Sequence, residues 1–159
     1  MEIRKGVYTF YDGIEMLIVG YYGHGITNPE IENYRKISYN KEFGSLEGFK
    51  LDDKANIFFR NINVNELNNA FKVETKGRYK DETFSLWGYN KNRNVVGVIT
   101  NDDKIAQKLD FIELSDFYIK EVSPEELDVI WEERTDSEFN LPMPEGIEKK
   151  KIIYQNDIS

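Results

Sequence analysis

The sequence predicts an α+β fold, in which a mainly antiparallel, twisted sheet of about six to eight strands carries about three short helices packed on it. Short apolar or alternating segments bounded by Gly, Asn and Asp recur along most of the chain, which is typical of strands joined by tight turns. Only three places combine a helix cap with a helical apolar pattern, and these are too short to connect parallel strands. The length of 159 residues predicts a single domain.

The first forty residues predict a hairpin followed by a short helix. Residues 7–11 and 14–22 have strand character, and Asp12-Gly13 between them favours a tight turn. The second strand contains the unbroken apolar run from Met16 to Val19, which is typical of a central strand covered on both faces. Asn28 as a cap and Pro29 at the first helical position then predict a short helix that ends near Arg35.

The middle of the chain predicts further strands and a second helix. Asn63 and Glu66 form a capping pattern before Leu67, Ala70 and Phe71, which would share one helical face. Turns are expected at Lys76-Gly77 and at residues 90–92. The expected strands cover residues 37–43, 48–51, 55–60, 71–75, 83–89 and 95–100.

The last third of the chain is expected to contain the third helix, and this helix would carry the most negative charge. Ser123-Pro124-Glu125-Glu126 has the spacing of a capping box with Pro at the first helical position. Leu127, Ile130 and Trp131 would then face the sheet, and the acidic side chains would face solvent. The expected acidic face consists of Glu125, Glu126, Asp128, Glu132 and Glu133. A loop over about residues 136–148 and a final strand or docking tail over 149–159 complete the prediction.

Composition limits the kinds of site that the chain can hold. Cysteine is absent, which excludes disulfides and thiolate metal sites and fits a reducing compartment. The amino terminus lacks an apolar signal segment, and no stretch of about 18 apolar residues occurs. We therefore expect a cytoplasmic protein with no metal ion and no cofactor.

The formal net charge is −8, from 29 acidic and 21 basic side chains. Such a surface repels the phosphate backbone of nucleic acids, so direct nucleic-acid binding is disfavoured. Two interpretations of the charge remain. The excess carboxylates keep the protein dispersed, or they complement a basic partner.

The loop after the first hairpin is the main candidate for chemistry. His24, which is the only histidine, lies between Gly23 and Gly25, and Asn28 follows before the expected helix. This spacing partly matches a phosphate-binding turn, but Asn28 stands where a dinucleotide-binding fingerprint needs Gly or Ala. A plain turn is therefore the favoured interpretation.

Two further patterns have an ordinary structural explanation. The acid pairs Asp52-Asp53 and Asp102-Asp103 lack EF-hand spacing, so solvated turns are expected. The aromatic stretch 84–90 can form a platform for stacking sugars, although sheet core is favoured.

Three functions are consistent with these patterns. The first is a non-catalytic protein-binding module, of the inhibitor or toxin-immunity type, whose acidic face neutralises a basic partner such as a toxin or nuclease. The second is an enzyme or small-ligand binder that uses the loop of Gly23, His24, Gly25 and Asn28. The third is a structural or assembly subunit that pairs through exposed aromatic residues and the carboxy-terminal segment.

Overall fold

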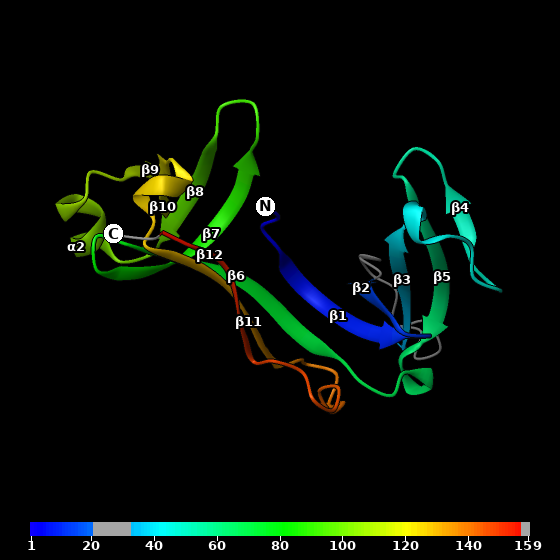
Figure 1. The fold of residues 1–159 in the computed structure, drawn as a ribbon. Helices are drawn as coiled ribbons and strands as arrows, with labels where there is room; N and C mark the ends of the chain where they lie inside the picture. Colours follow the sequence, from blue (N-terminus) through cyan, green and yellow to red (C-terminus); the bar gives the residue numbers. More distant parts are fainter. Residues whose placement is uncertain (21–32, 157–159) are drawn as a thin grey trace. The chain divides into compact units, whose positions relative to one another are not determined.

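The computed structural model describes residues 1–20 and 33–156. The chain divides into two compact units (Figure 1). Unit 1 comprises residues 1–5, 73–134 and 148–159, and unit 2 comprises residues 6–72 and 135–147.

The fold is nearly all β, which corrects the predicted α+β class. All twelve strands of the described residues belong to one hydrogen-bonded sheet, and neighbouring strands such as β1 and β2 or β8 and β10 run antiparallel. The described residues contain one α-helix, α2 (Asp103–Lys108), and three single 3-10 turns. The expectation of six to eight strands with three helices was therefore wrong on both counts.

Unit 2 contains a meander of antiparallel strands. The hairpin of β1 (Lys5–Tyr11) and β2 (Ile14–Gly20) is confirmed, with Asp12 and Gly13 both at positive φ in its turn. β3 (Tyr34–Asn40), β4 (Lys50–Asp52) and β5 (Ile57–Asn63) come next in the chain, and the order across the sheet is β4-β5-β3-β2-β1. The buried core of this unit consists of Met16, Ile18, Ile37, Tyr39, Ile62, Leu67 and Ala70.

Unit 1 is built on the strand order β6-β7-β8-β10-β9, and β11 pairs with β6 and β12. Its strands are β6 (Phe71–Tyr79), β7 (Glu82–Asn90), β8 (Val95–Thr100), β9 (Ile112–Leu114), β10 (Phe117–Val122), β11 (Val129–Asp136) and β12 (Lys150–Gln155). Buried residues recur at alternate positions along β6 and β7. The buried core of this unit consists of Tyr79, Phe84, Leu86, Val96, Val98, Val122, Leu127 and Ile130.

Two of the predicted helix starts exist, but no α-helix continues from them. Capping boxes form at Asn63 and at Ser123, and each closes only a 3-10 turn, η2 (Val64–Glu66) or η3 (Pro124–Glu126). Leu67 and Leu127 then return to extended backbone. A capping box satisfies the first backbone donors of a turn and does not determine the conformation of the residues after that turn. The apolar residues expected on the helix are buried, but they lie in extended backbone: Leu127, Ile130 and Trp131.

Three other segments also differ from the prediction. The helix expected from Asn28 to Arg35 lies largely outside the described residues, and its last two positions, Tyr34 and Arg35, begin β3. No turn forms at Lys76-Gly77, because β6 continues to Tyr79 and the chain turns at Lys80 and Asp81, which both have positive φ. The sequence pattern did not reveal α2, whose cap is Asp102.

Candidate functional site

The sheet of unit 1 has an apolar outer face opposite its core. Trp87 on β7 pairs with Gly97 on β8, while the preceding residue, Leu86, pairs with Val98, and both of these lie in the core. Because successive strand residues point to opposite faces, Trp87 is on the outer face. The same alternation, followed through the register of β8 with β10 and of β10 with β9, places five further apolar side chains on this outer face. We call this set, Trp87, Ile99, Ile112, Leu114, Phe117 and Ile119, the Trp87 surface.

Several of these side chains are well exposed to solvent. The exposed fraction is 55% for Trp87, 68% for Ile112 and 44% for Leu114, and the other three are half-buried. Trp87 and Phe117 are in ring contact, with centroids 5.2 Å apart. Single exposed apolar residues are ordinary, whereas a neighbouring group that includes a tryptophan is typical of a binding surface.

The backbone presents Trp87 through two glycines. The register of β7 against β8 shifts between Trp87 and Tyr89, and Gly88 in this bulge has φ +68, a conformation that favours glycine. Gly97 lies so close to β7 that a Cβ there would be 2.6 Å from the Trp87 carbonyl oxygen. Bulges redirect side chains and are common near binding sites.

Two hollows border Trp87. One, of about 600 Å³, is bordered by the amino-terminal residues Ile3, Arg4 and Lys5 and by Leu86, Trp87 and Phe117. The second, of about 580 Å³, is bordered by Trp87, Leu114 and Ile119. Both volumes lie in the range of pockets that hold a drug-sized molecule or several side chains of a partner, roughly 300–1,000 Å³.

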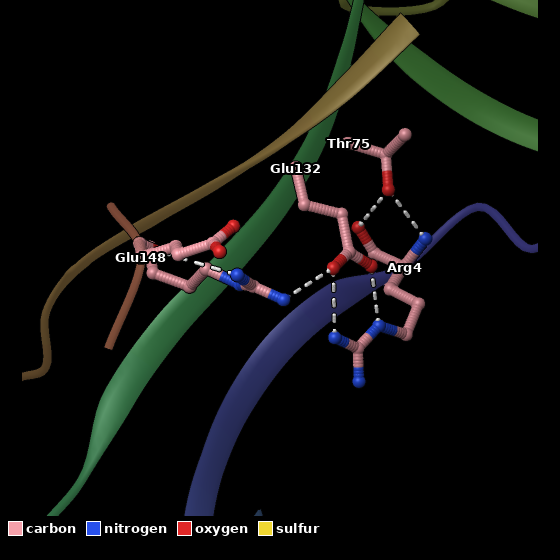
Figure 2. A network of polar contacts seen from close by, with 5 residues as sticks. Arg4, Thr75, Glu132 and Glu148 are labelled. Carbon is pink, nitrogen blue, oxygen red and sulfur yellow. Dashed lines mark hydrogen bonds and ion pairs between the residues drawn. The ribbon is translucent and has the colours of Figure 1, made fainter. Parts of the chain in front are cut away.

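The amino-terminal wall of the first hollow is held by a buried polar network (Figure 2). The Arg4 amide donates to Thr75 Oγ1 at 2.7 Å, and the Arg4 carbonyl accepts from the Thr75 amide at 2.9 Å. The Arg4 guanidinium donates to both Glu132 oxygens, from Nε at 2.6 Å and from Nη2 at 3.0 Å. This two-point contact fixes the direction of the side chain as well as its charge.

Glu132 has a second cationic partner. Arg134 Nη2 donates to Glu132 Oε1 at 2.8 Å, and Arg134 Nη1 donates to the Glu148 carbonyl oxygen. Burial alone raises the pKa of Glu132, but the hydrogen bond from Arg4 and the charges of Arg4, Arg134 and Lys151 outweigh it, so the net pKa lies below its ordinary value. Within the described residues, Arg134 Nε is buried without a hydrogen-bond partner.

The structure separates the five residues of the expected acidic face. Glu125 and Glu126 are exposed at η3, and the Glu126 side chain accepts from the Ser123 amide. Asp128 is half-buried, Glu132 is buried in the network with the two arginines, and Glu133 pairs with Lys76 at 2.9 Å. These residues therefore do not form one negative helix face, because the helix that would align them is absent.

The other sequence candidates have simpler positions. Gly23, His24, Gly25 and Asn28 lie outside the described residues. Asp52 accepts from backbone amides in a turn, and Asp102 caps α2. No cluster of three potential metal ligands occurs in residues 1–20 and 33–156. Over the same residues, no helix is long and apolar enough to span a bilayer.

Sequence reasoning underestimated Trp87. The expectation of sheet core for the stretch 84–90 holds for one side of the strand only: Phe84 and Leu86 lie in the core, while Trp87 is exposed. The alternation of side chains along a strand indicates this difference, because it places Trp87 on the face opposite Phe84 and Leu86. A sugar-stacking role of this stretch stays a prediction.

Comparison with known proteins identifies a family. Residues 3–139 match a family described as "Uncharacterised conserved protein UCP033725". No curated protein matches the chain, and no solved structure does.

Proposed function

The chain belongs to the family of uncharacterised conserved protein UCP033725, and we propose that it acts as a protein-binding module that recognises its partner through the Trp87 surface. The single observation that supports this function is the exposed tryptophan between two hollows on an apolar sheet face. We thus keep the protein-binding role expected from the sequence and assign it to the Trp87 surface, because the expected acidic helix is absent.

The geometry fits the way in which proteins recognise each other. Binding energy at protein interfaces is concentrated in a few residues, among which Trp is enriched, and these are surrounded by contacts that exclude water. Trp87 lies on β7, at one end of the strands that carry the apolar group, and it borders both hollows. Ile3 and Phe117 adjoin it at one hollow, and Leu114 and Ile119 adjoin it at the other.

The surface is also held rigid, which lowers the entropic cost of binding. Gly97 packs against the Trp87 backbone, and Phe117 packs against the Trp87 ring. The contacts of Arg4 with Thr75 and Glu132 fix the wall formed by residues 3–5. A preorganised site needs little ordering when the partner arrives.

Site-specific photo-crosslinking tests this proposal. A photo-crosslinking amino acid is introduced at Leu114 on β9 or, as the matched control, at Leu51 on β4, whose exposed fractions are 44% and 48%. Both positions are in three-residue strands at an end of the strand order. Irradiation in cells that express the chain is expected to give protein adducts from position 114 only. Equal adducts from both positions, or none from position 114, would refute the proposal.

Small-ligand binding is a second candidate, and the hollow of about 600 Å³ favours it. Its wall combines apolar side chains with the polar groups of Lys5 and Asn101. A ligand that binds only the folded chain raises its unfolding midpoint. A thermal-shift screen is expected to find compounds whose effect is lost in Phe117→Ala but kept in Phe49→Ala, and effects that survive both changes would exclude this hollow.

A further inference from the structure

Resting on the proposed function, we infer that the partner contributes an extended segment that adds to β9 as a new strand, with apolar residues at alternate positions and Lys or Arg between them. Three observations support it: the open edge, the alternation of β9 and the charge around it.

β9 is an open edge of the described sheet. It is the last strand in the order β6-β7-β8-β10-β9 and pairs only with β10 among the described residues. Residues 112–116, which include β9 and the turn after it, are all exposed. An edge strand offers backbone donors and acceptors to another extended chain, and strand addition is a common mode of peptide recognition.

The side chains of β9 divide between two faces of different character. Ile112 and Leu114 belong to the Trp87 surface, whereas Glu113 pairs with Tyr118 on the opposite face. A strand added beside β9 alternates in the same way. Its residues next to Ile112 and Leu114 would extend the apolar surface, and the residue next to Glu113 would face a carboxylate.

The edge carries unpaired negative charge. Asp110, Glu113 and Asp116 are exposed, and none has an ion pair within the described part of the chain. Tyr118, opposite Glu113, donates to Asp103 at 2.7 Å. This hydrogen bond, with desolvation of the phenol and the charges of Asp103 and Glu113, raises the pKa of Tyr118 to about 12. Lys or Arg beside Glu113 would therefore meet a negative potential.

Charge also decides between a foreign partner and a second copy of the chain. Two copies joined through β9 would bring the same three carboxylates together, and each copy has a formal charge of −8. Like charges directly opposite each other destabilise strand pairing. A basic segment of another protein is thus the favoured occupant.

Three blocked probe peptides test the inference. The first alternates valine and lysine, the second replaces lysine by glutamate, and the third replaces valine by serine. Binding to the full chain is followed by the shifts of backbone amide signals in NMR spectra. Only the valine-lysine peptide is expected to bind, with the largest shifts at Ile112, Glu113 and Leu114.

Two matched variants refine the test. Glu113→Lys is expected to weaken binding of the valine-lysine peptide about tenfold, because it turns an attractive cross-strand pair into a repulsive one. Glu47→Lys changes an exposed carboxylate of unit 2 by the same charge and is expected to leave affinity unchanged. Equal weakening by both variants would mean that net charge alone drives binding, and it would overturn the inference.

Other outcomes of the peptide experiment would overturn strand addition or identify a different occupant. Binding of the glutamate peptide as tightly as the lysine peptide, shifts confined to residues away from β9, or no binding by any peptide would each overturn strand addition. A dimer of the chain that Glu113→Lys disrupts would identify a second copy as the occupant instead. The crosslinking comparison of Leu114 with Leu51 decides the proposed function separately, because it requires no particular peptide chemistry.

Discussion

Gly97 and Trp87 are paired across β8 and β7 so closely that a Cβ on Gly97 would lie 2.6 Å from the Trp87 carbonyl oxygen. The nearest atom belongs to the backbone, so the strands themselves must move if a side chain is added. The position of Trp87 on the outer face thus depends on the absence of a side chain on the adjacent strand.

Gly97→Ala is expected to lower the free energy of unfolding by about 1–3 kcal/mol, the usual cost of overpacking a well-packed position. Gly20→Ala is the control, because nothing lies within 4 Å of a Cβ built at Gly20. Urea unfolding of both variants measures the difference. A Gly97→Ala protein as stable as the Gly20→Ala protein would contradict the close contact.

Glu132→Gln tests the network that holds the amino-terminal wall. The change leaves Arg4 and Arg134 without their carboxylate, and breaking one side of a buried ion pair costs about 3–5 kcal/mol. Glu121→Gln breaks an exposed pair with Arg93 and is expected to cost at most about 1 kcal/mol. Chemical denaturation compares the two. Similar losses would show that Glu132 is not held as described.

The phenol of Tyr118 is expected to titrate near pH 12, because the neutral group donates to Asp103. Since its pKa is raised on folding, the stability that this contact contributes is present below about pH 10, the pKa of an unperturbed tyrosine. It is lost as the pH rises through about 12. NMR titration of the tyrosine rings follows the group. An unchanged Tyr118 titration in Asp103→Asn would contradict the assigned cause.

Local turn chemistry was predictable from the sequence, and long-range pairing was not. Asp12-Gly13 correctly predicted the first hairpin, and both capping boxes form where Asn63 and Ser123 indicated them. The helices expected after those caps were wrong because Leu67 and Leu127 are buried in extended chain. Core burial outweighs the local helical preference at such positions.

The candidate site was harder to predict for the same reason. Glu132 belonged to an expected solvent-facing helix, yet in β11 it is buried against Arg4, 128 residues away in sequence. No local pattern announces that pairing. The alternation of the strand is enough to place Trp87 on the face opposite Leu86. Its exposure also requires that no other described segment covers the outer face of β7, β8 and β10.

The affinity of a crosslinked partner for Trp87→Ala tests whether Trp87 carries the binding energy of this surface. Phe43→Ala, which removes an aromatic side chain that is 70% exposed in unit 2, is the control. Loss of a tryptophan that carries much of the binding energy is expected to cost at least about 2 kcal/mol, or roughly 30-fold in the dissociation constant. We expect that loss for Trp87→Ala and an unchanged dissociation constant for Phe43→Ala. A partner that binds Trp87→Ala as tightly as the unaltered chain would contradict this expectation.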